Sequence, residues 1–177
     1  EKYRETLREQ RRSDFARLIE TFIDFLDHDA GRRFTQGDPS RDRPPLEHVL
    51  VDEYQDTNPL QQELYFRLLE KLNEPKITVV GDDDQALYRF RGGTVECLIR
   101  FPRRVEERFG VSVESIQLKT NYRSTEDIVS WCNRYVNQNP LMNESGARAP
   151  DKESMTVGRD GTEGQESVKA ILEGDND

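Results

Sequence analysis

The sequence contains few of the residues that build disulfide frameworks and metal centres. Its 177 residues include two cysteines, Cys97 and Cys132, which are too few for a disulfide framework or a cysteine-based metal site. The two histidines, His28 and His48, have no other ligand residues at metal-binding spacing, so we assign them no chemistry. No signal peptide is visible, and no apolar run approaches the roughly 18 residues of a membrane span. We therefore expect a cytoplasmic protein that has no membrane partner.

Lysine is scarce as well, since only six of the 26 basic residues are lysines. With 35 acidic residues the formal net charge is -9, which taken alone argues against an obvious binder of polyanions. The charge is unevenly distributed, because residues 141–177 hold nine acidic and four basic residues and no aromatic residue. We expect this stretch to be a flexible, polar and acidic linker or tail.

Alternating helix and strand patterns predict an α/β domain. Apolar residues at helical spacing predict helices, and short apolar runs predict buried strands. In chain order, we expect a helix at 1–26, a loop at 28–45, a strand at 48–51, a helix at 59–72, a strand at 77–80, a loop at 82–93, a helix at 95–109 bent at Pro102, a strand at 113–118, a helix at 125–137 and a short helix near 165–172. Asn58 followed by Pro59 is typical of a helix start. Strands that alternate with helices indicate a mainly parallel sheet.

Polar residues follow each of the two short apolar runs. The first run is followed by Asp52 and Glu53, and the second by residues 81–85 and then by an aromatic and arginine cluster at residues 88–91. Adjacent carboxylates at a strand end suit metal-assisted nucleotide hydrolysis, because one can hold Mg²⁺ while the next activates water. Aromatic rings and guanidinium groups suit single-stranded nucleic acid, where they stack on bases and meet phosphates. The sequence therefore predicts two coupled sites, as a nucleic-acid motor needs.

Three segments carry a resemblance to a known family. They are Asp52-Glu53-Tyr-Gln-Asp56, Gly81-Asp82-x-x-Gln85-x-x-Tyr88-x-Phe90-Arg91-Gly92 and Leu118-x-x-Asn121-Tyr122-Arg123-Ser124-Thr125. In this order and at this spacing, they resemble motifs II, III and IV of the superfamily 1 DNA helicases of the UvrD/Rep/PcrA type. Residues 13–18 also resemble the segment that precedes motif II in that family, so the resemblance covers residues 13–137.

The resemblance implies a role for each matching residue of the nucleotide site. Asp52 would coordinate Mg²⁺, and Glu53 would orient or deprotonate the attacking water. Gln85 would sense the γ-phosphate and report its loss to the DNA side. Arg123 would act as an arginine finger on the transferring phosphoryl group, and Tyr122 would stack on the nucleotide base.

The resemblance also implies contacts with DNA. Phe90 would stack on a DNA base, and Tyr88 and Arg91 would help to line the path of the single strand. Gly81 and Gly92 would permit tight backbone turns.

The residues themselves leave several alternatives open. Phe90 and Tyr122 could instead be core aromatics, and Arg123 could cap a helix or pair with a carboxylate. The acidic residues 82–84 suggest a metal cluster, but a solvated acidic turn is the better interpretation. Asp56 would order the first turn rather than take part in the chemistry.

The fold that the resemblance implies is an incomplete recombinase-like motor lobe of the P-loop NTPase type. Residues 1–111 would form the second half of the first motor lobe, residues 112–140 the start of the second lobe, and residues 141–177 the acidic tail. No G-x-x-x-x-G-K-[ST] sequence occurs in the 177 residues, so the phosphate-binding loop and its lysine are missing. We expect a fragment that binds ATP poorly and hydrolyses it negligibly by itself.

The implied function is part of an ATP-dependent DNA helicase that moves 3′ to 5′ on single-stranded DNA and unwinds duplexes in repair or replication restart. Its cofactors would be ATP and Mg²⁺, and its partners single-stranded DNA, single-strand/duplex junctions and repair proteins at the nucleoid. Two alternatives stay open: a non-catalytic remnant that binds single-stranded DNA or a partner protein, and the motor part of a recombination helicase-nuclease. A self-contained metal-dependent phosphohydrolase is more distant, because an acidic cluster without a phosphate clamp makes a poor active site.

Overall fold

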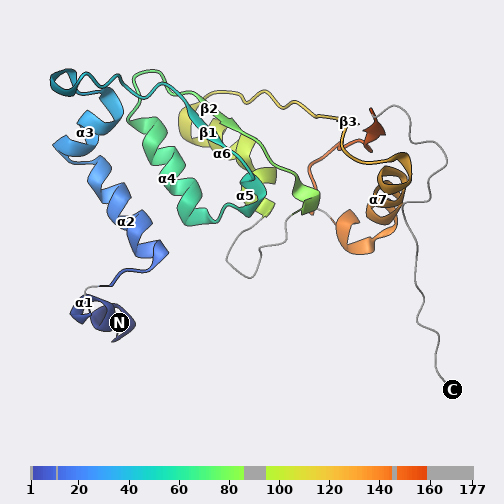
Figure 1. The fold of residues 1–177 in the computed structure, drawn as a ribbon, viewed down its shortest axis with the longest axis horizontal. Coiled ribbons are helices and arrows are strands. Elements are labelled where there is room, and N and C mark those ends of the chain that lie inside the picture. The colour runs from blue at the N-terminus through green and yellow to red at the C-terminus, as the bar shows by residue number, and fades with distance from the viewer. Residues whose placement is uncertain (1, 11, 86–94, 145–146, 159–177) are drawn as a thin grey trace. The chain divides into compact units, whose positions relative to one another are not determined.

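The computed structural model describes residues 2–10, 12–85, 95–144 and 147–158. Helices and strands are mixed along the chain, and both sheets are small and parallel (Figure 1). The α-helices are α1 (Lys2–Glu9), α2 (Phe15–Leu26), α3 (Asp29–Gln36), α4 (Pro59–Glu70), α5 (Val95–Ile99), α6 (Phe101–Phe109) and α7 (Glu126–Gln138). The 3₁₀-helices are η1 (Pro39–Arg41), η2 (Tyr54–Asp56), η3 (Asp83–Gln85) and η5 (Pro140–Asn143), and the strands are β1 (Val49–Val51), β2 (Ile77–Val79), β3 (Thr120–Asn121) and β4 (Thr156–Val157). The predicted α/β class with parallel strand pairing is confirmed for these residues.

The chain divides into two compact units, Glu1–Leu98 and Ile99–Asp177. The first unit holds the β1–β2 sheet, and the second holds the β3–β4 sheet and α7. The sequence prediction placed its boundaries at residues 111 and 140 from the motifs rather than from packing, and those boundaries stay predictions. Along the described residues, no helix is both long enough and apolar enough to cross a membrane.

The first unit contains a β–α–β unit made by β1, α4 and β2. The two strands pair in parallel, with Val49 opposite Ile77 and Val51 opposite Val79. Both strands were predicted, and their sequences are rich in β-branched residues, which favour strands. Because the strands are parallel, their carboxyl ends lie at the same edge of the sheet.

The helix that connects the two strands, α4, begins where the sequence predicts. The side chain of Asn58 accepts a hydrogen bond from the backbone N–H of Gln61, and the Gln61 side chain accepts one from the backbone N–H of Asn58, both at 2.9 Å. Pro59 takes the first helical position, where the missing N–H would have no helical partner anyway. Phe66 and Leu69 are buried on α4, which packs against α2.

Three phenylalanines cluster where α2 meets α3. The ring centroids of Phe22 and Phe34 lie 5.6 Å apart in an edge-on arrangement, and those of Phe22 and Phe25 lie 5.7 Å apart. The guanidinium carbon of Arg43 lies 4.5 Å from the centroid of Phe34. Gly31 allows the two helices to approach, because a Cβ there would clash with the carbonyl oxygen of Phe25.

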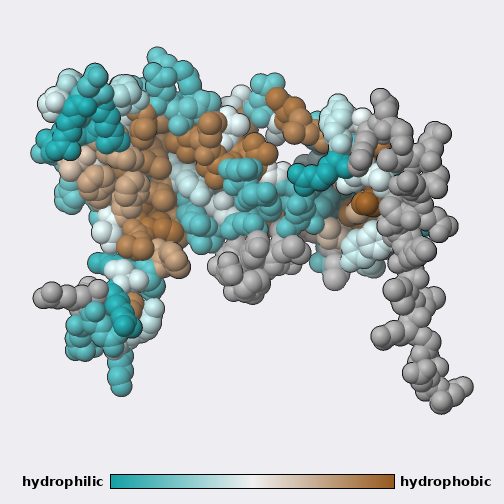
Figure 2. Space-filling view, in the orientation of Figure 1, coloured by the Kyte–Doolittle hydropathy of each residue, from teal (hydrophilic) through white to brown (hydrophobic). Residues whose placement is uncertain are grey.

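The single helix predicted at residues 1–26 is wrong, because the chain forms two helices there, α1 and α2. Asp14 begins α2 by accepting a hydrogen bond from the N–H of Arg17 at 2.7 Å, and it accepts a second from the Tyr3 hydroxyl at 3.1 Å. A side chain that satisfies the first free N–H groups of a helix sets its start. Figure 2 shows apolar residues over α2, where Phe15 and Leu18 are exposed.

The loop predicted at residues 28–45 is also wrong, because Asp29–Gln36 form α3. The two glycines that suggested a loop have other roles. Gly31 permits the contact with α2, and Gly37 ends the helix with φ of 87°, a conformation that favours glycine. Thr35 is buried and donates its hydroxyl to the carbonyl of Gly31 at 3.2 Å.

The second unit differs from the prediction in its strands. The chain breaks near Pro102 as expected, with Pro102 in the first turn of α6. Residues 113–118, predicted as a strand, belong to no strand, because an alternating pattern forms one only where a neighbour offers backbone hydrogen bonds. Such bonds begin at Lys119, whose carbonyl accepts the N–H of Thr156 at 2.8 Å, and β3 pairs with β4 from there.

Backbone atoms of Met155 link the segment before β4 to α7. The helix α7 itself was predicted correctly. The Asn133 side chain donates to the carbonyl of Met155 at 2.8 Å and accepts from its N–H at 3.2 Å. β4 therefore pairs within the stretch that we expected to be an acidic linker or tail. The rest of that expectation, with the short helix near 165–172, concerns residues outside the described ones.

Candidate nucleotide site

Asp52 and Glu53 follow β1 directly. Glu53 adopts the left-handed conformation, with φ of 51° and ψ of 43°, which costs a residue with a Cβ on the order of 1–3 kcal/mol. The carboxylate of Asp52 accepts a hydrogen bond from the Glu53 N–H at 2.9 Å and so supports the turn. Both side chains are exposed. The sharp turn therefore presents two adjacent carboxylates to solvent at the edge of the sheet.

Residues 81–85 form the second turn at this edge. The N–H of Tyr54 donates to the carbonyl of Val80 at 2.9 Å, so the two turns are joined by backbone as soon as the strands end. Asp82 organises its own turn: its carboxylate accepts the Asp84 N–H at 3.1 Å and the Gln85 side-chain amide at 2.6 Å. Gln85 is thus held in place through its amide while it stays exposed.

Gln55 connects the two turns through its side chain. Its Nε2 donates to Oε2 of Glu53 at 2.6 Å, and its Oε1 accepts the backbone N–H of Asp82 at 3.0 Å. Gln55 is only 3% exposed. A Cβ on Gly81 would lie 2.7 Å from Oε1 of Gln55, so glycine is needed there for close approach rather than for a positive φ.

A buried polar pair supports the first turn from α4. Tyr54 is fully buried, and its hydroxyl accepts a hydrogen bond from Nε2 of Gln62 at 2.8 Å. The same nitrogen donates to the carbonyl of Cys97 in α5 at 3.2 Å. The predicted DNA-contacting residues 88–91 lie between Asp82 and Cys97 in the chain. Gln55 bonds to Asp82 before them, and Gln62 bonds to Cys97 after them.

Backbone groups close the first turn. The N–H of Asp56 donates to the carbonyl of Glu53, and the N–H of Thr57 donates to that of Tyr54, both at 3.0 Å. Oδ1 of Asp56 is buried and has no hydrogen-bond partner among the described residues, so the backbone of Asp56, not this oxygen, orders the turn. Burial raises the pKa of Tyr65 on α4, and its hydrogen bond with Thr57 acts in the opposite direction.

The acidic residues 82–84 lie close together, with carboxylate oxygens within 4.8 Å of one another. Asp83 is buried, and the Asp82 carboxylate accepts hydrogen bonds from residues of its own turn. The hydrogen bonds of Asp82 favour the interpretation of an acidic turn over that of a metal cluster, but the burial of Asp83 shows that this turn is less solvated than we expected.

Tyr122 and Arg123 lie in the second unit. The side-chain oxygen of Asn121 accepts the backbone N–H groups of Arg123 at 2.9 Å and Ser124 at 2.8 Å, which fixes the turn before α7. Tyr122 is 75% exposed, so it is not a core aromatic of this unit. Its ring lies against Gly158, where a Cβ would come within 2.6 Å of Cε1.

The structure therefore gathers part of the predicted site. Asp52, Glu53 and Gln85 lie at one edge of the β1–β2 sheet, while Tyr122 and Arg123 belong to the other compact unit. Tyr88, Phe90, Arg91 and Gly92 lie outside the described residues. Sequence reasoning assigned no role to Gln55 and Gln62. The available signal was a glutamine among acidic turn residues for Gln55 and a glutamine inside a predicted helix for Gln62, and both patterns are too common to single these residues out.

Comparison with known proteins identifies the family. The sequence model of the UvrD/REP helicase N-terminal domain matches residues 1–106. DNA helicase II of Escherichia coli (strain K12) is 40% identical over 97 residues, which make up 55% of this chain and 12% of the relative. ATP-dependent DNA helicase UvrD1 of Mycobacterium tuberculosis (strain ATCC 25618 / H37Rv) is 39% identical over 102 residues, or 55% of this chain and 13% of the relative.

A third relative, DNA helicase IV of Escherichia coli (strain K12), is 38% identical over 96 residues, or 54% of this chain and 13% of that protein. The chain thus spans 12–13% of the length of these relatives. The family match covers more than half of the chain and includes both turns at the edge of the β1–β2 sheet. The chain belongs to the UvrD/REP helicase family and carries part of its N-terminal domain.

Proposed function

We propose that the chain is part of an ATP-dependent DNA helicase and supplies residues that hydrolyse the nucleotide. The observation that supports this is the shared edge of β1 and β2, where Gln55 links Glu53 to the turn at residues 81–85. In open α/β sheets, ligands bind at the carboxyl ends of parallel strands. The proposed fold is part of a recombinase-like lobe of the P-loop NTPase type, in which residues 52–56, 81–92 and 118–125 serve as motifs II, III and IV.

Within this proposal, Asp52 holds Mg²⁺ and Glu53 orients or deprotonates the attacking water. The donor chemistry fits, because both side chains are exposed carboxylates and Mg²⁺ prefers hard oxygen ligands. When bound, the ion supplies positive charge that offsets the charge of the phosphates. Gln85, whose amide donates to Asp82, senses the γ-phosphate.

The second unit contributes Arg123 to charge neutralisation and Tyr122 to stacking on the nucleotide base. The exposure of the Tyr122 ring supports a stacking role, because a buried ring could not receive a base. On the DNA side, Phe90 stacks on a base and Tyr88 and Arg91 line the path of the single strand.

The wider activity that we propose is coupling of Mg-ATP hydrolysis to 3′–5′ movement on single-stranded DNA and to unwinding at single-strand/duplex junctions. This work would take place in the cytoplasm at the nucleoid, with repair proteins as partners, in DNA repair or replication restart. Its support is the family membership and the names of the relatives, which are DNA helicases.

A first test is the gene sequence on both sides of residues 1–177. An in-frame G-x-x-x-x-G-K-[ST] sequence upstream would support the proposal that this segment lies inside an active helicase. A start codon directly before Glu1 and a stop codon directly after Asp177 would overturn the catalytic role.

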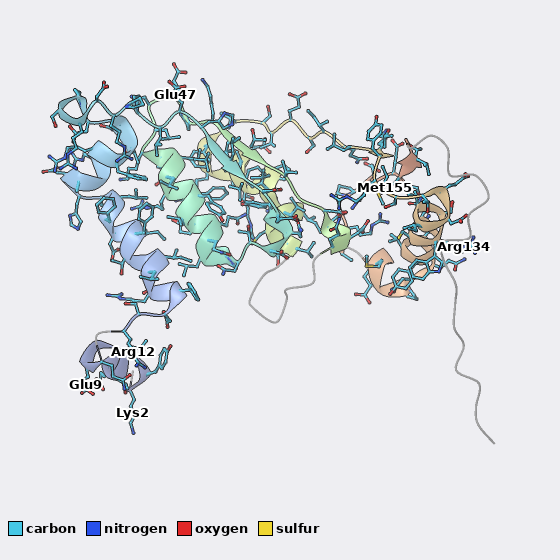
Figure 3. All side chains as sticks on the ribbon, viewed as in Figure 1. Lys2, Glu9, Arg12, Glu47, Arg134 and Met155 are labelled. Atoms are coloured by element: carbon cyan, nitrogen blue, oxygen red, sulfur yellow. The ribbon has the colours of Figure 1, made fainter. Side chains whose placement is uncertain are left out.

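The second test is Mg²⁺-dependent ATP hydrolysis by a polypeptide that contains residues 1–177 together with the upstream G-x-x-x-x-G-K-[ST] sequence. Glu53→Gln should lower kcat by roughly a hundredfold or more, because it removes the group that handles the attacking water. Glu47→Gln is the matched control, since Glu47 is an exposed carboxylate shortly before β1 (Figure 3). Equal rates in the two variants would contradict the role of Glu53. Residues 1–177 alone should hydrolyse ATP negligibly.

A further inference from the structure

One buried carboxamide joins two turns that are far apart in sequence. Gln55 bonds to Glu53 through Nε2 at 2.6 Å and to the backbone of Asp82, 27 residues away, through Oε1 at 3.0 Å. Gln55 is 3% exposed, so its amide is shielded from competing water, whereas the Glu53 carboxylate at the other end of the first bond is exposed. The pairing of β1 with β2 does not by itself require this side chain to contact both turns, and no helix or strand of the described residues contains both turns.

A carboxamide is the side chain that satisfies both partners at once. The carboxylate of Glu53 can only accept, and the backbone N–H of Asp82 can only donate, so one donor and one acceptor are needed between them. This requirement also fixes which end of the amide faces each turn. A carboxylate at position 55 would keep the bond to Asp82 but would repel Glu53, and a hydrocarbon would lose both bonds.

The amide has little room to move. Gly81 lies against it so closely that a Cβ there would lie 2.7 Å from Oε1. The adjacent Tyr54 is fully buried and bonded through its N–H to the carbonyl of Val80. Displacement of either turn must therefore be transmitted through Gln55 or break one of its bonds.

We propose that Gln55 is a positioning residue that ties the orientation of the Glu53 carboxylate to the position of the turn at residues 81–85. Binding of single-stranded DNA to residues 88–91 would shift this turn, which lies immediately before them in the chain. Through Gln55, the shift would reorient the carboxylate that handles the attacking water. This inference rests on the function proposed above and names the residue that makes hydrolysis respond to DNA.

Gln62 provides a matched control within the same unit. It is also a buried glutamine, 4% exposed, and its amide bonds to Tyr54 and to the carbonyl of Cys97. These bonds to Tyr54 and Cys97 reach neither Glu53 nor Asp82. A substitution at Gln62 therefore removes a buried amide of the same kind without breaking the link between the two turns.

The link is tested first by nuclear magnetic resonance on residues 1–177, with no need for activity. Glu53→Gln removes the charge at one end and should shift the backbone amide resonance of Asp82 and speed its hydrogen exchange by up to about tenfold. The same change in a Gln55→Met or Gln55→Leu background, where both bonds are lost, should leave Asp82 unaffected, whereas a Gln62→Met background should preserve the response. The proposal would be overturned if Glu53→Gln left the Asp82 amide unchanged in the otherwise natural chain. It would also be overturned if Glu53→Gln changed the Asp82 amide equally in the variants that lack Gln55. Two replacements at position 55 are used so that a folding defect in one does not end the test.

The catalytic consequence is tested in the ATP-hydrolysing polypeptide. Gln55→Glu should lower kcat roughly tenfold to a hundredfold with little change in KM, and single-stranded DNA should no longer stimulate it. Gln62→Met should keep the stimulation. Normal DNA stimulation in Gln55→Glu and in Gln55→Met would overturn the positioning role. If the natural polypeptide does not hydrolyse ATP, the proposed function fails, while the resonance experiment still decides whether Gln55 links the turns.

Discussion

A side chain on Gly81 could not coexist with Gln55 in its observed position, because a Cβ would lie 2.7 Å from Oε1 of the amide. Gly81→Ala should therefore displace the amide and destabilise the first unit by about 1–3 kcal/mol, measured by urea unfolding. Gly110→Ala is the contrasting variant, since a Cβ there meets nothing within 4 Å and any cost comes from its φ of 69°. In the double variant Gly81→Ala with Gln55→Ala, the loss of stability should be smaller than the sum of the losses in the two single variants, because the clash is absent once the amide is removed. Additive losses would mean that the amide is not the obstacle.

Gly31→Ala should destabilise the packing of α2 against α3. The added Cβ would meet backbone atoms, including Cα of Leu26 at 2.6 Å, and backbone cannot move aside as a side-chain end can. We expect a loss of at least about 2 kcal/mol in the free energy of unfolding. The exposed neighbouring change Ala30→Gly should cost only about 1 kcal/mol, from helix propensity. Equal losses would show that the contact does not limit the packing.

Asn58→Ala should lower stability by about 1 kcal/mol, because it removes the side chain that caps α4. Asn58→Asp should retain most of the stability, since a carboxylate also accepts the N–H of Gln61. Thermal unfolding followed by circular dichroism measures both. A loss in Asn58→Asp as large as that in Asn58→Ala would show that the cap bond is not the source of the effect.

Acid should weaken the contact between α2 and α4 through Asp27. Hydrogen bonding to Lys71, together with the charges of Arg67 and Lys71, holds the pKa of Asp27 below its ordinary value. A carboxyl whose pKa is lowered on folding adds stability above its unfolded pKa of about 4, and this stability is lost as pH falls through the folded value. Asp27→Asn should therefore flatten the dependence of stability on pH below about 4. Asp24→Asn, at an exposed carboxyl of the same helix, controls for the loss of one charge, and an unchanged slope in Asp27→Asn would contradict the prediction.

Binding of single-stranded DNA separates the helicase proposal from that of a non-catalytic remnant. Phe90→Ala should weaken binding by about 1–3 kcal/mol in either case, because a stacking ring is lost. Fluorescence anisotropy with a labelled oligonucleotide measures it, and Asp52→Ala should not change the affinity of residues 1–177. In the longer polypeptide with ATP, Asp52→Ala should alter DNA affinity if hydrolysis drives movement. Indifference to ATP and to Asp52 there would favour the remnant.

Local chemical signals predicted the β–α–β unit well. The strands Val49–Val51 and Ile77–Val79 are short runs rich in β-branched residues. Asn58 followed by Pro59 indicates a helix start, and its cap bonds involve residues no more than four positions away. The position of Asp52 and Glu53 beside the turn that follows β2 could be expected from parallel pairing, whereas Gln85 is placed through its bond to Asp82. These features were predictable because each depends on nearby sequence or on one simple rule of sheets.

Features that depend on distant partners were missed. The helix α3 contains a glycine that suggests a loop, and only its contact with Phe25 and Leu26 explains why glycine is needed there. Residues 113–118 alternate like a strand, yet the strand that forms, β3, pairs with β4 in a polar stretch without a strand signal. Gln55 was overlooked for the same reason, since its second partner, Asp82, lies in another turn.

The parallel pairing of β1 and β2 also determines where this molecule tolerates change. The N–H of Val49 donates to the carbonyl of Lys76 at 2.9 Å, so the connection from α4 to β2 lies at the amino ends of the strands. The carboxylates and Gln55 lie at the opposite ends. Chain length between residues 72 and 76 should therefore vary without displacing the residues of the proposed nucleotide site. A fluorescent label or small tag inserted after the exposed Asn73 should report on the protein while leaving that edge of the sheet undisturbed.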